Sequence, residues 1–334
     1  MGCNAPQEGW IVQTSDKTVQ SCGQGHRLSL PHDPHHALGA KRPFNLWVQA
    51  MQALRNWPLE DRKNITGVFT DIDDTLTTTD GAITSEALLA LGRLKSAGLD
   101  VIAVTGRPVG WSEPFAASWP VDAIVAENGA VALYFKNVEN FKNFQHKNSR
   151  QHIPGLRKQL LKRYQQNDAT RHANQARMQH VTRRITQEVT GALLAQDSAG
   201  RETDMAIDHS EFSYLPPERI AQVVRIMQSE GMNATISSIH INGWFGAHNK
   251  IQGAHWIVQA LLGRDLNAEK DRWVFVGDST NDQLMFEAFN NSIGVANVRR
   301  FETQLTHLPR YITQRERGAG FAEVAEALLA VHTA

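Results

Sequence analysis

Two aspartates one residue apart, Asp71 and Asp73, are the residues of this sequence best placed to do chemistry. They directly follow the apolar run Gly67–Thr70, which predicts a buried strand, and in an open α/β sheet ligands bind at the carboxyl ends of the strands. Two carboxylates at one strand end repel each other, so one of them must hold a proton or a cation must neutralise them. The pair therefore predicts a catalytic or cation-binding site, although acidic strand ends also occur as solvated caps.

A hydroxyl residue and a glycine end a second apolar run, residues 101–104. Thr105 and Gly106 follow this run directly, and Arg107 comes next. A threonine hydroxyl and free backbone N–H groups at a strand end can donate to phosphate oxygens. The segment therefore predicts phosphate binding by Thr105, Gly106 and Arg107, and the alternative is an ordinary strand followed by a turn.

Hard oxygen ligands come with a third apolar run, residues 273–276. This run leads to Asp278, and Asn281 and Asp282 follow after a tight turn. Carboxylates gathered at one point suit Mg²⁺, which binds carboxylates, waters and substrate phosphate oxygens. The alternative is that Asp278 only caps the helix predicted over residues 283–288.

One lysine, Lys250, stands at the start of the helix predicted over residues 252–262. A lysine near several carboxylates would offset their repulsion and bind a phosphoryl oxygen. A lysine at the start of a helix is uninformative by itself, so its assignment depends on the order of all four segments along the chain.

The composition is that of a soluble globular protein of 334 residues. Hydrophobic residues make up 41% and charged residues 20% of the chain, and the formal net charge is zero. Such a chain can bury two cores and has no global field to attract nucleic acid or membranes. No apolar run is long enough to span a bilayer, the N-terminus lacks a signal pattern, and Cys3 and Cys22 are too few for a disulfide framework. We expect a cytoplasmic protein without nucleic-acid or membrane partners, and the sequence leaves the oligomeric state open.

Residues 1–63 are expected to form an N-terminal extension outside the folded domains. Gly, Pro, His, Gln and Ser dominate up to about residue 41, and this composition favours disorder. The spacing of Cys22 and the histidines that follow it fits no standard zinc pattern. Residues 44–54 have helical apolar periodicity and predict one amphipathic helix, which packs on the core or binds a partner.

The rest of the chain alternates strand and helix, apart from a long central insert. Continuous apolar strands separated by helices predict a doubly wound parallel sheet over residues 64–133 and 247–334. Residues 134–246 interrupt this rhythm and predict an inserted α+β cap domain, joined by two crossings as in a hinged lid. Residues 136–190 carry twelve Lys and Arg against three acids. This part of the cap is therefore either a solvated helical face or an attractor of anionic substrates.

Taken in order, the four segments resemble the four signature motifs of the haloacid dehalogenase-like hydrolase superfamily. The resemblance spans about residues 64–330, and the large insert resembles that of the class IIB branch, which includes Cof-type hydrolases and sugar-phosphate phosphatases. It implies a Rossmann-like α/β core with an inserted α+β cap. Two departures stand out: Asp74 occupies a position where many members have Gly, and Ile251 follows Lys250 where Gly is common.

The resemblance implies a role for each residue near the phosphoryl group. Asp71 would be the nucleophile that forms an aspartyl phosphate. Asp73 would be the acid for the leaving group and then the base for water. Thr105, with the Gly106 N–H, would hold the phosphoryl oxygens. Lys250 would neutralise the phosphoryl group and the nucleophile.

The resemblance also implies a metal site. Asp71, Asp278 and the main-chain oxygen of Asp73 would bind Mg²⁺, and Asp282 and Asn281 would support the metal or the lysine from the next shell. An acid two residues after the nucleophile separates phosphatases from true dehalogenases, because halide leaves without protonation. The expected cofactor is therefore Mg²⁺ and the expected substrate carries a phosphate.

The cap is expected to select the leaving group. His240, Asn242 and Trp244 lie on the last strand-like segment of the cap or just after it, so Trp244 could stack on a sugar ring while Asn242 binds hydroxyls. Alternatively, Trp244 and Phe245 only pack the hinge. We therefore expect a Mg²⁺-dependent phosphatase of a small phosphorylated metabolite, with a sugar phosphate as the favoured class. The alternatives are a sugar phosphomutase and a non-catalytic phospho-ligand binding protein.

Overall fold

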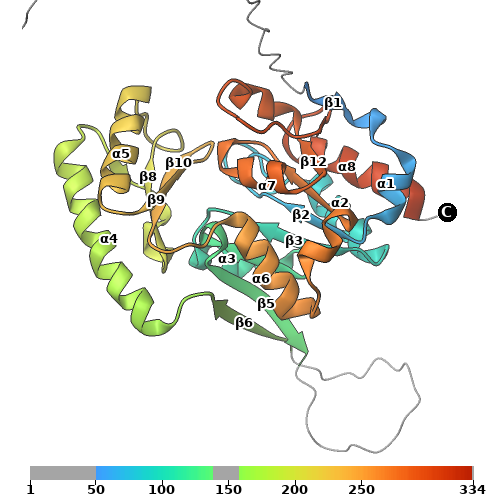
Figure 1. Ribbon diagram of the computed structural model, residues 1–334, viewed down its shortest axis with the longest axis horizontal. Helices are drawn as coiled ribbons and strands as arrows, with labels where there is room; N and C mark the ends of the chain where they lie inside the picture. The colour runs from blue at the N-terminus through green and yellow to red at the C-terminus, as the bar shows by residue number, and fades with distance from the viewer. Residues whose placement is uncertain (1–49, 138–157, 333–334) are drawn as a thin grey trace, which may run out of the picture. The chain divides into compact units, whose positions relative to one another are not determined.

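The computed structural model describes residues 50–137 and 158–332, which fall within one compact unit, Val48–Ala334. Its core is a nine-stranded sheet with helices on both faces (Figure 1). In sheet order, the strands are β1 (Gln52–Ala53), β13 (Tyr311–Ile312), β12 (Asn291–Gly294), β11 (Trp273–Gly277), β2 (Gly67–Thr70), β3 (Asp100–Val104), β4 (Ala123–Ala126), β5 (Val131–Asn137) and β6 (Lys158–Tyr164). The strands from β1 to β4 in this order are parallel, and β5 and β6 extend one edge as antiparallel strands.

Two apolar clusters join the helices to the faces of this sheet. One face packs against α2 (Ser85–Ser96), α3 (Val109–Ser118) and α8 (Arg317–His332), with α1 (Leu59–Asn64) beside α8. The other face packs against α6 (Lys250–Leu262) and α7 (Gln283–Ala288). This is the doubly wound, Rossmann-like α/β fold that the strand and helix alternation predicts. It places the carboxyl ends of β2, β3 and β11 next to one another.

The cap is a second, smaller α+β layer. Its sheet has the order β7-β8-β10-β9 and is antiparallel throughout. Its strands are β7 (Leu193–Leu194), β8 (Asp204–Asp208), β9 (Asn233–Ile236) and β10 (His240–Trp244), and its helices are α4 (Asp168–Glu188) and α5 (Pro217–Ser229). Alternate residues of β8 and β10 pack with the two helices in a third apolar cluster. The opposite face of β10, with His240 and Asn242, is therefore left for the site.

Short 3₁₀ helices complete the described chain. They are η1 (Leu54–Asn56), η2 (Glu127–Gly129), η3 (Gln196–Gly200), η4 (Leu266–Arg272), η5 (Thr280–Asp282) and η6 (Ala296–Phe301). Three of them, η2, η5 and η6, directly follow or nearly follow the carboxyl end of a core strand. They carry several of the polar side chains described below.

The observed strand pairing differs from two of the predicted domain boundaries, the start of the cap and the start of the core. Residues 134–137 of β5 and all of β6 pair within the core sheet, so the cap begins after Tyr164 rather than at residue 134. Residues 52–53 pair with β13, and α1 packs on α8, so the core starts before residue 64. Residues 52–53 are also a strand rather than part of the helix predicted over residues 44–54, because they complete the edge of the parallel sheet.

Several sequence predictions fall outside the described residues. Among them are Cys3, Cys22 and the histidines after Cys22, residues 44–49 of the predicted amphipathic helix, and most of the basic stretch before residue 158. In the described ranges, no helix combines the length and the apolar character needed to cross a membrane.

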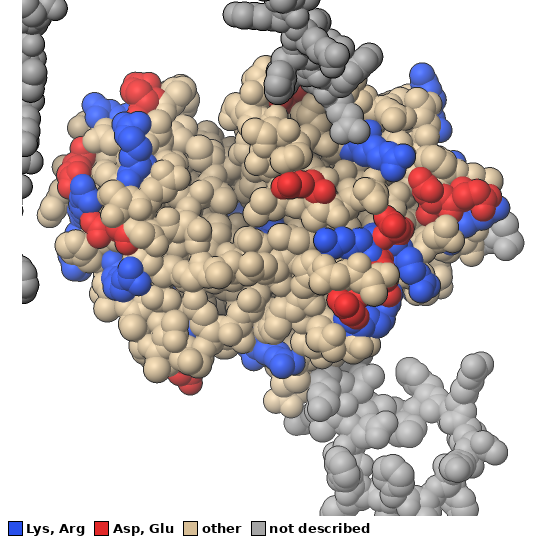
Figure 2. Space-filling view, viewed as in Figure 1, with Lys and Arg blue, Asp and Glu red and all other residues tan. Residues whose placement is uncertain are grey.

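Two of the four arginines on α4, in the described part of the basic cap stretch, pair with acids. On α4, Arg171 bonds Asp168, and Arg184 lies 2.7 Å from Glu188 and 2.8 Å from Glu230. Figure 2 accordingly shows Lys and Arg side chains next to Asp and Glu side chains over the α4 and α5 part of the cap. Such exposed pairs are typical of a solvated helical face.

Candidate active site

A buried lysine joins two of the predicted carboxylates. Asp71 follows β2, and Lys250 is the first residue of α6, where the Asn249 side chain caps the helix by accepting from the Gln252 N–H. The Lys250 Nζ lies 2.6 Å from Asp71 Oδ1 and 2.7 Å from Asp282 Oδ1. All three side chains are at most 4% exposed. Lys250, whose assignment from the sequence depends on the order of the four segments, is therefore in direct contact with the predicted nucleophile.

The acidic residues of the first and fourth motifs form one buried cluster. Carboxylate oxygens of Asp71, Asp278 and Asp282 all lie within 4.8 Å of one another. Burial raises the pKa of Asp71 to about 8, with Lys250 opposing and the neighbouring carboxylates adding to the rise. Burial and the Asp71 charge also raise the pKa of Asp278 well above its ordinary value. A cation in the cluster would relieve this repulsion.

The hydrogen bonds of this cluster leave one carboxylate oxygen open. Asp278 Oδ2 accepts from Asn297 Nδ2 at 3.0 Å, whereas the buried Asp278 Oδ1 has no hydrogen-bond partner among the described residues. Both oxygens of Asp282 are occupied, because Oδ1 faces Lys250 and Oδ2 accepts from the Asp278 and Ser279 N–H groups. The donor set of Asp71 and Asp278 therefore fits a divalent metal, and Asp282 holds the lysine and the loop.

Asn281 lies at the rim of this cluster. Its Oδ1 accepts from the Ser279 hydroxyl at 2.9 Å, and the residue lines the cavity between core and cap. Nearby, the Thr280 hydroxyl donates to the main-chain oxygen of Ile236 at the end of β9. The fourth motif thus contacts the cap as well as the other carboxylates.

Asn297 and Arg317 complete the cluster, and the sequence did not identify them. Asn297 Nδ2 also donates to the main-chain oxygen of Asp74, and Asn297 Oδ1 accepts from the Arg317 N–H. The Arg317 Nε lies 2.7 Å from Asp74 Oδ1. Asp74 has a φ of 53°, a left-handed conformation that Asp and Asn tolerate better than most side chains. The Asp in place of Gly therefore anchors the turn after β2 to α8.

The second motif forms a tight loop after β3. Thr105 is fully buried, and its Oγ1 accepts from the Arg107 N–H at 2.9 Å. No acceptor for the Thr105 hydroxyl proton and no partner for the Gly106 N–H occur in the part of the chain that the structure describes. Both groups are therefore available as hydrogen-bond donors in this conformation.

Arg107 is tied to three carboxylates. Its Nε lies 2.8 Å from Asp73 Oδ1, its Nη1 lies 3.2 Å from Asp197 Oδ2 and its Nη2 lies 2.8 Å from Glu211 Oε1. Burial disfavours the charged guanidinium of Arg107 and so lowers its pKa, but Asp73 and Glu211 outweigh this effect and raise the pKa above its ordinary value. Every guanidinium nitrogen is thus engaged, and Arg107 links the core to the cap in this conformation.

A rigid loop brings Glu211 to this arginine. The Asp208 carboxylate accepts from four consecutive backbone N–H groups, residues 210–213. Glu211 Oε2 lies 2.7 Å from His240 Nε2. Although burial opposes ionisation, His240 and Arg107 lower the pKa of Glu211 to about 2. His240 therefore stands next to the cavity with a fixed anionic neighbour.

Two of the three predicted cap residues line the site, and the third does not. His240 and Asn242 line a cavity of about 10 Å³ with Asp71, Asp73 and Gly106. The other lining residues are Arg107, Ser237, Ser238, Ile239 and Asn281. This is room for about one water molecule, so a substrate enters only when the cap moves. A larger groove of about 670 Å³ lies at the amino-terminal ends of the strands, away from these residues.

Trp244 packs at the hinge instead of facing the cavity. Its side chain is buried, its Nε1 donates to the His248 main-chain oxygen at 2.8 Å, and its ring stacks on the His248 ring. Phe245 is also buried and carries the guanidinium of Arg177 over its ring. The hinge-packing alternative therefore describes both residues, and stacking of Trp244 on a sugar has no support in this conformation.

The sequence matches a family model described as haloacid dehalogenase-like hydrolase over residues 68–324. A comparison with curated proteins finds no match. Among solved structures, a protein of Thermoplasma acidophilum is similar at 16% identity and a TM-score of 0.56, covering 79% of this chain and 98% of that chain. The C-terminal domain of the trehalose-6-phosphate phosphatase of C. albicans is similar at 14% identity and a TM-score of 0.55, covering 85% and 99%. The sucrose-phosphatase of Synechocystis, in complex with sucrose and phosphate, is similar at 14% identity and a TM-score of 0.53, covering 78% and 97%.

Proposed function

This chain belongs to the haloacid dehalogenase-like hydrolase family, and on this basis we propose that it is a Mg²⁺-dependent phosphatase of a small sugar phosphate. The observation that carries the proposal is the buried contact of Lys250 with Asp71, beside a second carboxylate, Asp278, with an open oxygen. A protein that only binds a ligand has no need to maintain this strained cluster. A buried lysine beside buried carboxylates is useful where a phosphoryl group must be bound and attacked by a carboxylate.

The reaction follows from the positions of two aspartates. A carboxylate oxygen of Asp71 attacks phosphorus, the bond to the leaving oxygen breaks, and Asp73 gives that oxygen a proton. Asp73 then takes a proton from water, which attacks the aspartyl phosphate and releases inorganic phosphate. Arg107 bonds only Oδ1 of Asp73, so the second carboxyl oxygen is available for both proton transfers. Lys250 and the Thr105 hydroxyl hold the phosphoryl oxygens.

The residues present fit a magnesium ion. Asp71, Asp278 and the main-chain oxygen of Asp73 would hold it, because hard oxygen ligands suit Mg²⁺ and Asp278 Oδ1 has no hydrogen-bond partner in the described ranges. When bound, Mg²⁺ supplies positive charge that keeps Asp71 ionised and offsets the charge of the phosphate. Asn297 orients Asp278, and Asp282 orients Lys250.

The cap side of the cavity favours an uncharged, hydroxyl-bearing leaving group. Arg107 and Arg201 are bonded to carboxylates or carbonyl oxygens through every guanidinium nitrogen. No lysine lines the cavity in the described ranges. Asn242 Oδ1 is buried there, has no hydrogen-bond partner among the described residues and can accept from a hydroxyl. A sugar monophosphate fits these groups. A second phosphate on the substrate, which a phosphomutase must hold, would find no unpaired cation among the described residues that line the cavity.

Two of the similar structures support the substrate class, since they are a trehalose-6-phosphate phosphatase and a sucrose-phosphatase. The test is phosphate release from a panel of sugar monophosphates, sugar bisphosphates and nucleoside monophosphates, with Mg²⁺ and with chelator. Wild type is compared with Asp71→Asn and with Asp168→Asn, a control at an exposed carboxylate. We expect Mg²⁺-dependent release from sugar monophosphates that only Asp71→Asn abolishes. Transfer of phosphate between two hydroxyls of one sugar would indicate a mutase, and binding without turnover would indicate a binding protein.

A further inference from the structure

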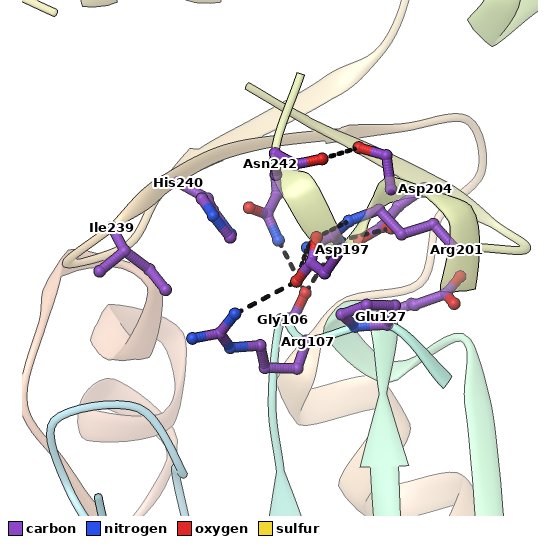
Figure 3. A network of polar contacts seen from close by, with 12 residues as sticks. Gly106, Arg107, Glu127, Asp197, Arg201, Asp204, Ile239, His240 and Asn242 are labelled. Carbon is purple, nitrogen blue, oxygen red and sulfur yellow. Dashed lines mark hydrogen bonds and ion pairs between the residues drawn. The ribbon is translucent and has the colours of Figure 1, made fainter. Parts of the chain in front are cut away.

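Two side chains of the cap converge on one main-chain oxygen of the phosphate-binding loop. Arg201 Nη1 and Asn242 Nδ2 each lie 3.0 Å from the carbonyl oxygen of Gly106 (Figure 3). Arg201 follows η3 and Asn242 lies on β10, so separate parts of the cap supply the two donors. The approach is close, because a Cβ atom at position 106 would lie 2.7 Å from Asn242 Nδ2.

The same peptide group controls the Thr105 hydroxyl. The carbonyl of Gly106 and the N–H of Arg107 belong to one planar unit, and this N–H donates to Thr105 Oγ1 at 2.9 Å. Fixing the carbonyl therefore fixes the N–H. Because the hydroxyl oxygen accepts this bond, its own proton is left to point elsewhere, and the phosphoryl group is the acceptor that the proposed reaction provides.

The Arg201 side chain is itself held rigidly. It is 2% exposed and lies 2.8 Å from Asp204 Oδ1 and 3.1 Å from Asp197 Oδ1. Asp204 Oδ2 in turn accepts from Asn128 Nδ2 of the core. Asp197 is shared with Arg107. A buried charge with this many partners cannot shift without breaking several bonds, so it supports a fixed position for the Gly106 carbonyl.

We propose that Arg201 and Asn242 are positioning residues that orient the Gly106–Arg107 peptide and thereby aim the Thr105 hydroxyl at the phosphoryl group. The proposal rests on the phosphatase function proposed above. Since both donors belong to the cap, the loop is fully held only when the cap is closed. Cap closure therefore has two effects: it excludes water from the site, and it completes the hydrogen bonds that hold the phosphate-binding loop.

The test compares Arg201→Lys with Arg184→Lys. The first keeps the buried charge that Asp197 and Asp204 need but loses the fork that also reaches Gly106. The second makes the same change at a cap arginine that pairs with two surface carboxylates. Asn242→Asp is a second variant of equal shape, in which a carboxylate replaces the donor. Assays use p-nitrophenyl phosphate with Mg²⁺, and inhibition by vanadate reports on the phosphoryl site.

We expect kcat/KM to fall about 10- to 100-fold in Arg201→Lys and in Asn242→Asp, with a fall in kcat. Vanadate inhibition should weaken in both variants, and Arg184→Lys should match wild type. Wild-type kcat and vanadate inhibition in the two site variants would overturn the proposal. A rise in KM alone would also overturn it, because that is the result of a looser cap over an intact loop.

Hydrogen exchange separates this proposal from the proposed reaction. In the full-length protein, amides of a peptide spanning residues 104–109 should exchange faster in Arg201→Lys than in wild type. The reason is that the hydrogen bond from the Arg107 N–H to Thr105 Oγ1 is no longer held in place through the Gly106 carbonyl. Unchanged exchange in that peptide would overturn the positioning role even if the enzyme is active. If wild type hydrolyses no compound of the panel, the phosphatase function fails, and the exchange rates still decide whether the cap holds the loop.

Discussion

Replacing Lys250 by methionine should destabilise the protein by about 3–5 kcal/mol, because it removes the only charge partner that two buried carboxylates have among the described residues. The Lys250 side chain is 2% exposed and lies 2.6 Å from Asp71 and 2.7 Å from Asp282. Methionine keeps the length and apolar stem of lysine but supplies no positive charge. Asp71 and Asp282, two of three carboxylates within 4.8 Å of one another, would then have no ion-pair partner in the part of the chain that the structure describes.

Lys162→Met is the matched control. Lys162 also contacts two carboxylates, Glu113 at 2.7 Å and Glu202 at 2.8 Å, but its side chain is 31% exposed. Solvent screens such a pair, so the same substitution should cost only about 0–1 kcal/mol. The comparison therefore isolates burial, because charge, residue type and number of partners are the same.

Urea unfolding followed by tryptophan fluorescence measures both variants against wild type. The buried Trp273 in the core sheet makes the signal sensitive to loss of the core. Hydrolysis should also fall at least about 100-fold in Lys250→Met and stay near wild type in Lys162→Met. A loss of less than about 1 kcal/mol in Lys250→Met, or the same loss of free energy of unfolding in both variants, would show that burial of this ion pair does not set its contribution to stability.

Three further predictions concern pH, a backbone contact and the metal. The buried His248 has a pKa of about 4 against an ordinary 6.5, so between these values the unfolded chain binds a proton that the folded chain does not. The free energy of unfolding should therefore fall by about 3 kcal/mol as the pH drops from 6.5 to 4, and His248→Phe should remove this part of the fall in urea titrations at several pH values. Gly129→Ala should cost about 2–4 kcal/mol, since φ is +105° and the new Cβ would lie 2.2 Å from the Asn249 carbonyl oxygen, whereas Gly98→Ala, with nothing within 4 Å, should cost about 1–2 kcal/mol. Equal losses in these two variants would contradict the argument from close contact. Adding Mg²⁺ at 100 times its Kd should raise the free energy of unfolding by about 2.7 kcal/mol, and chelator should reverse the gain; no response in wild type would speak against the metal site.

The core of the site could be predicted because each of its parts follows a parallel strand. Asp71, Thr105 and Asp278 come directly after apolar runs, and parallel strands bring their carboxyl ends to one edge of the sheet. The family resemblance was needed for Lys250, since a lysine at the start of a helix carries no signal by itself. The structure places it in contact with Asp71.

Other parts of the site depend on contacts that have no local signal. Asn297 lies just after β12, as the other site residues lie after their strands, and this position could have indicated it. Arg201 and Asp197 come from an irregular part of the cap, and only the packing of the cap brings them to Gly106. Trp244 shares a face of β10 with Asn242, so alternation alone could not tell the hinge from the cavity.

The cap boundary was mispredicted for a related reason. The sequence of β6, Lys158–Tyr164, is mostly polar and does not alternate in a way that identifies a strand. Its strand conformation comes from pairing with β5 along seven residues. Edge strands of this kind are specified by their neighbour more than by their own sequence.

Trapping a covalent intermediate on Asp71 tests the proposed reaction most directly. Wild type is mixed with Mg²⁺ and a sugar monophosphate that it hydrolyses, and the reaction is quenched in acid at short times. The protein is then digested, and mass spectrometry shows whether the peptide that contains Asp71 carries a phosphoryl group. We expect a transient phosphopeptide in wild type and none in Asp71→Asn. Release of phosphate with no phosphorylated Asp71 at any time of quenching would rule out the aspartyl phosphate, because the phosphoryl group would then pass directly to water.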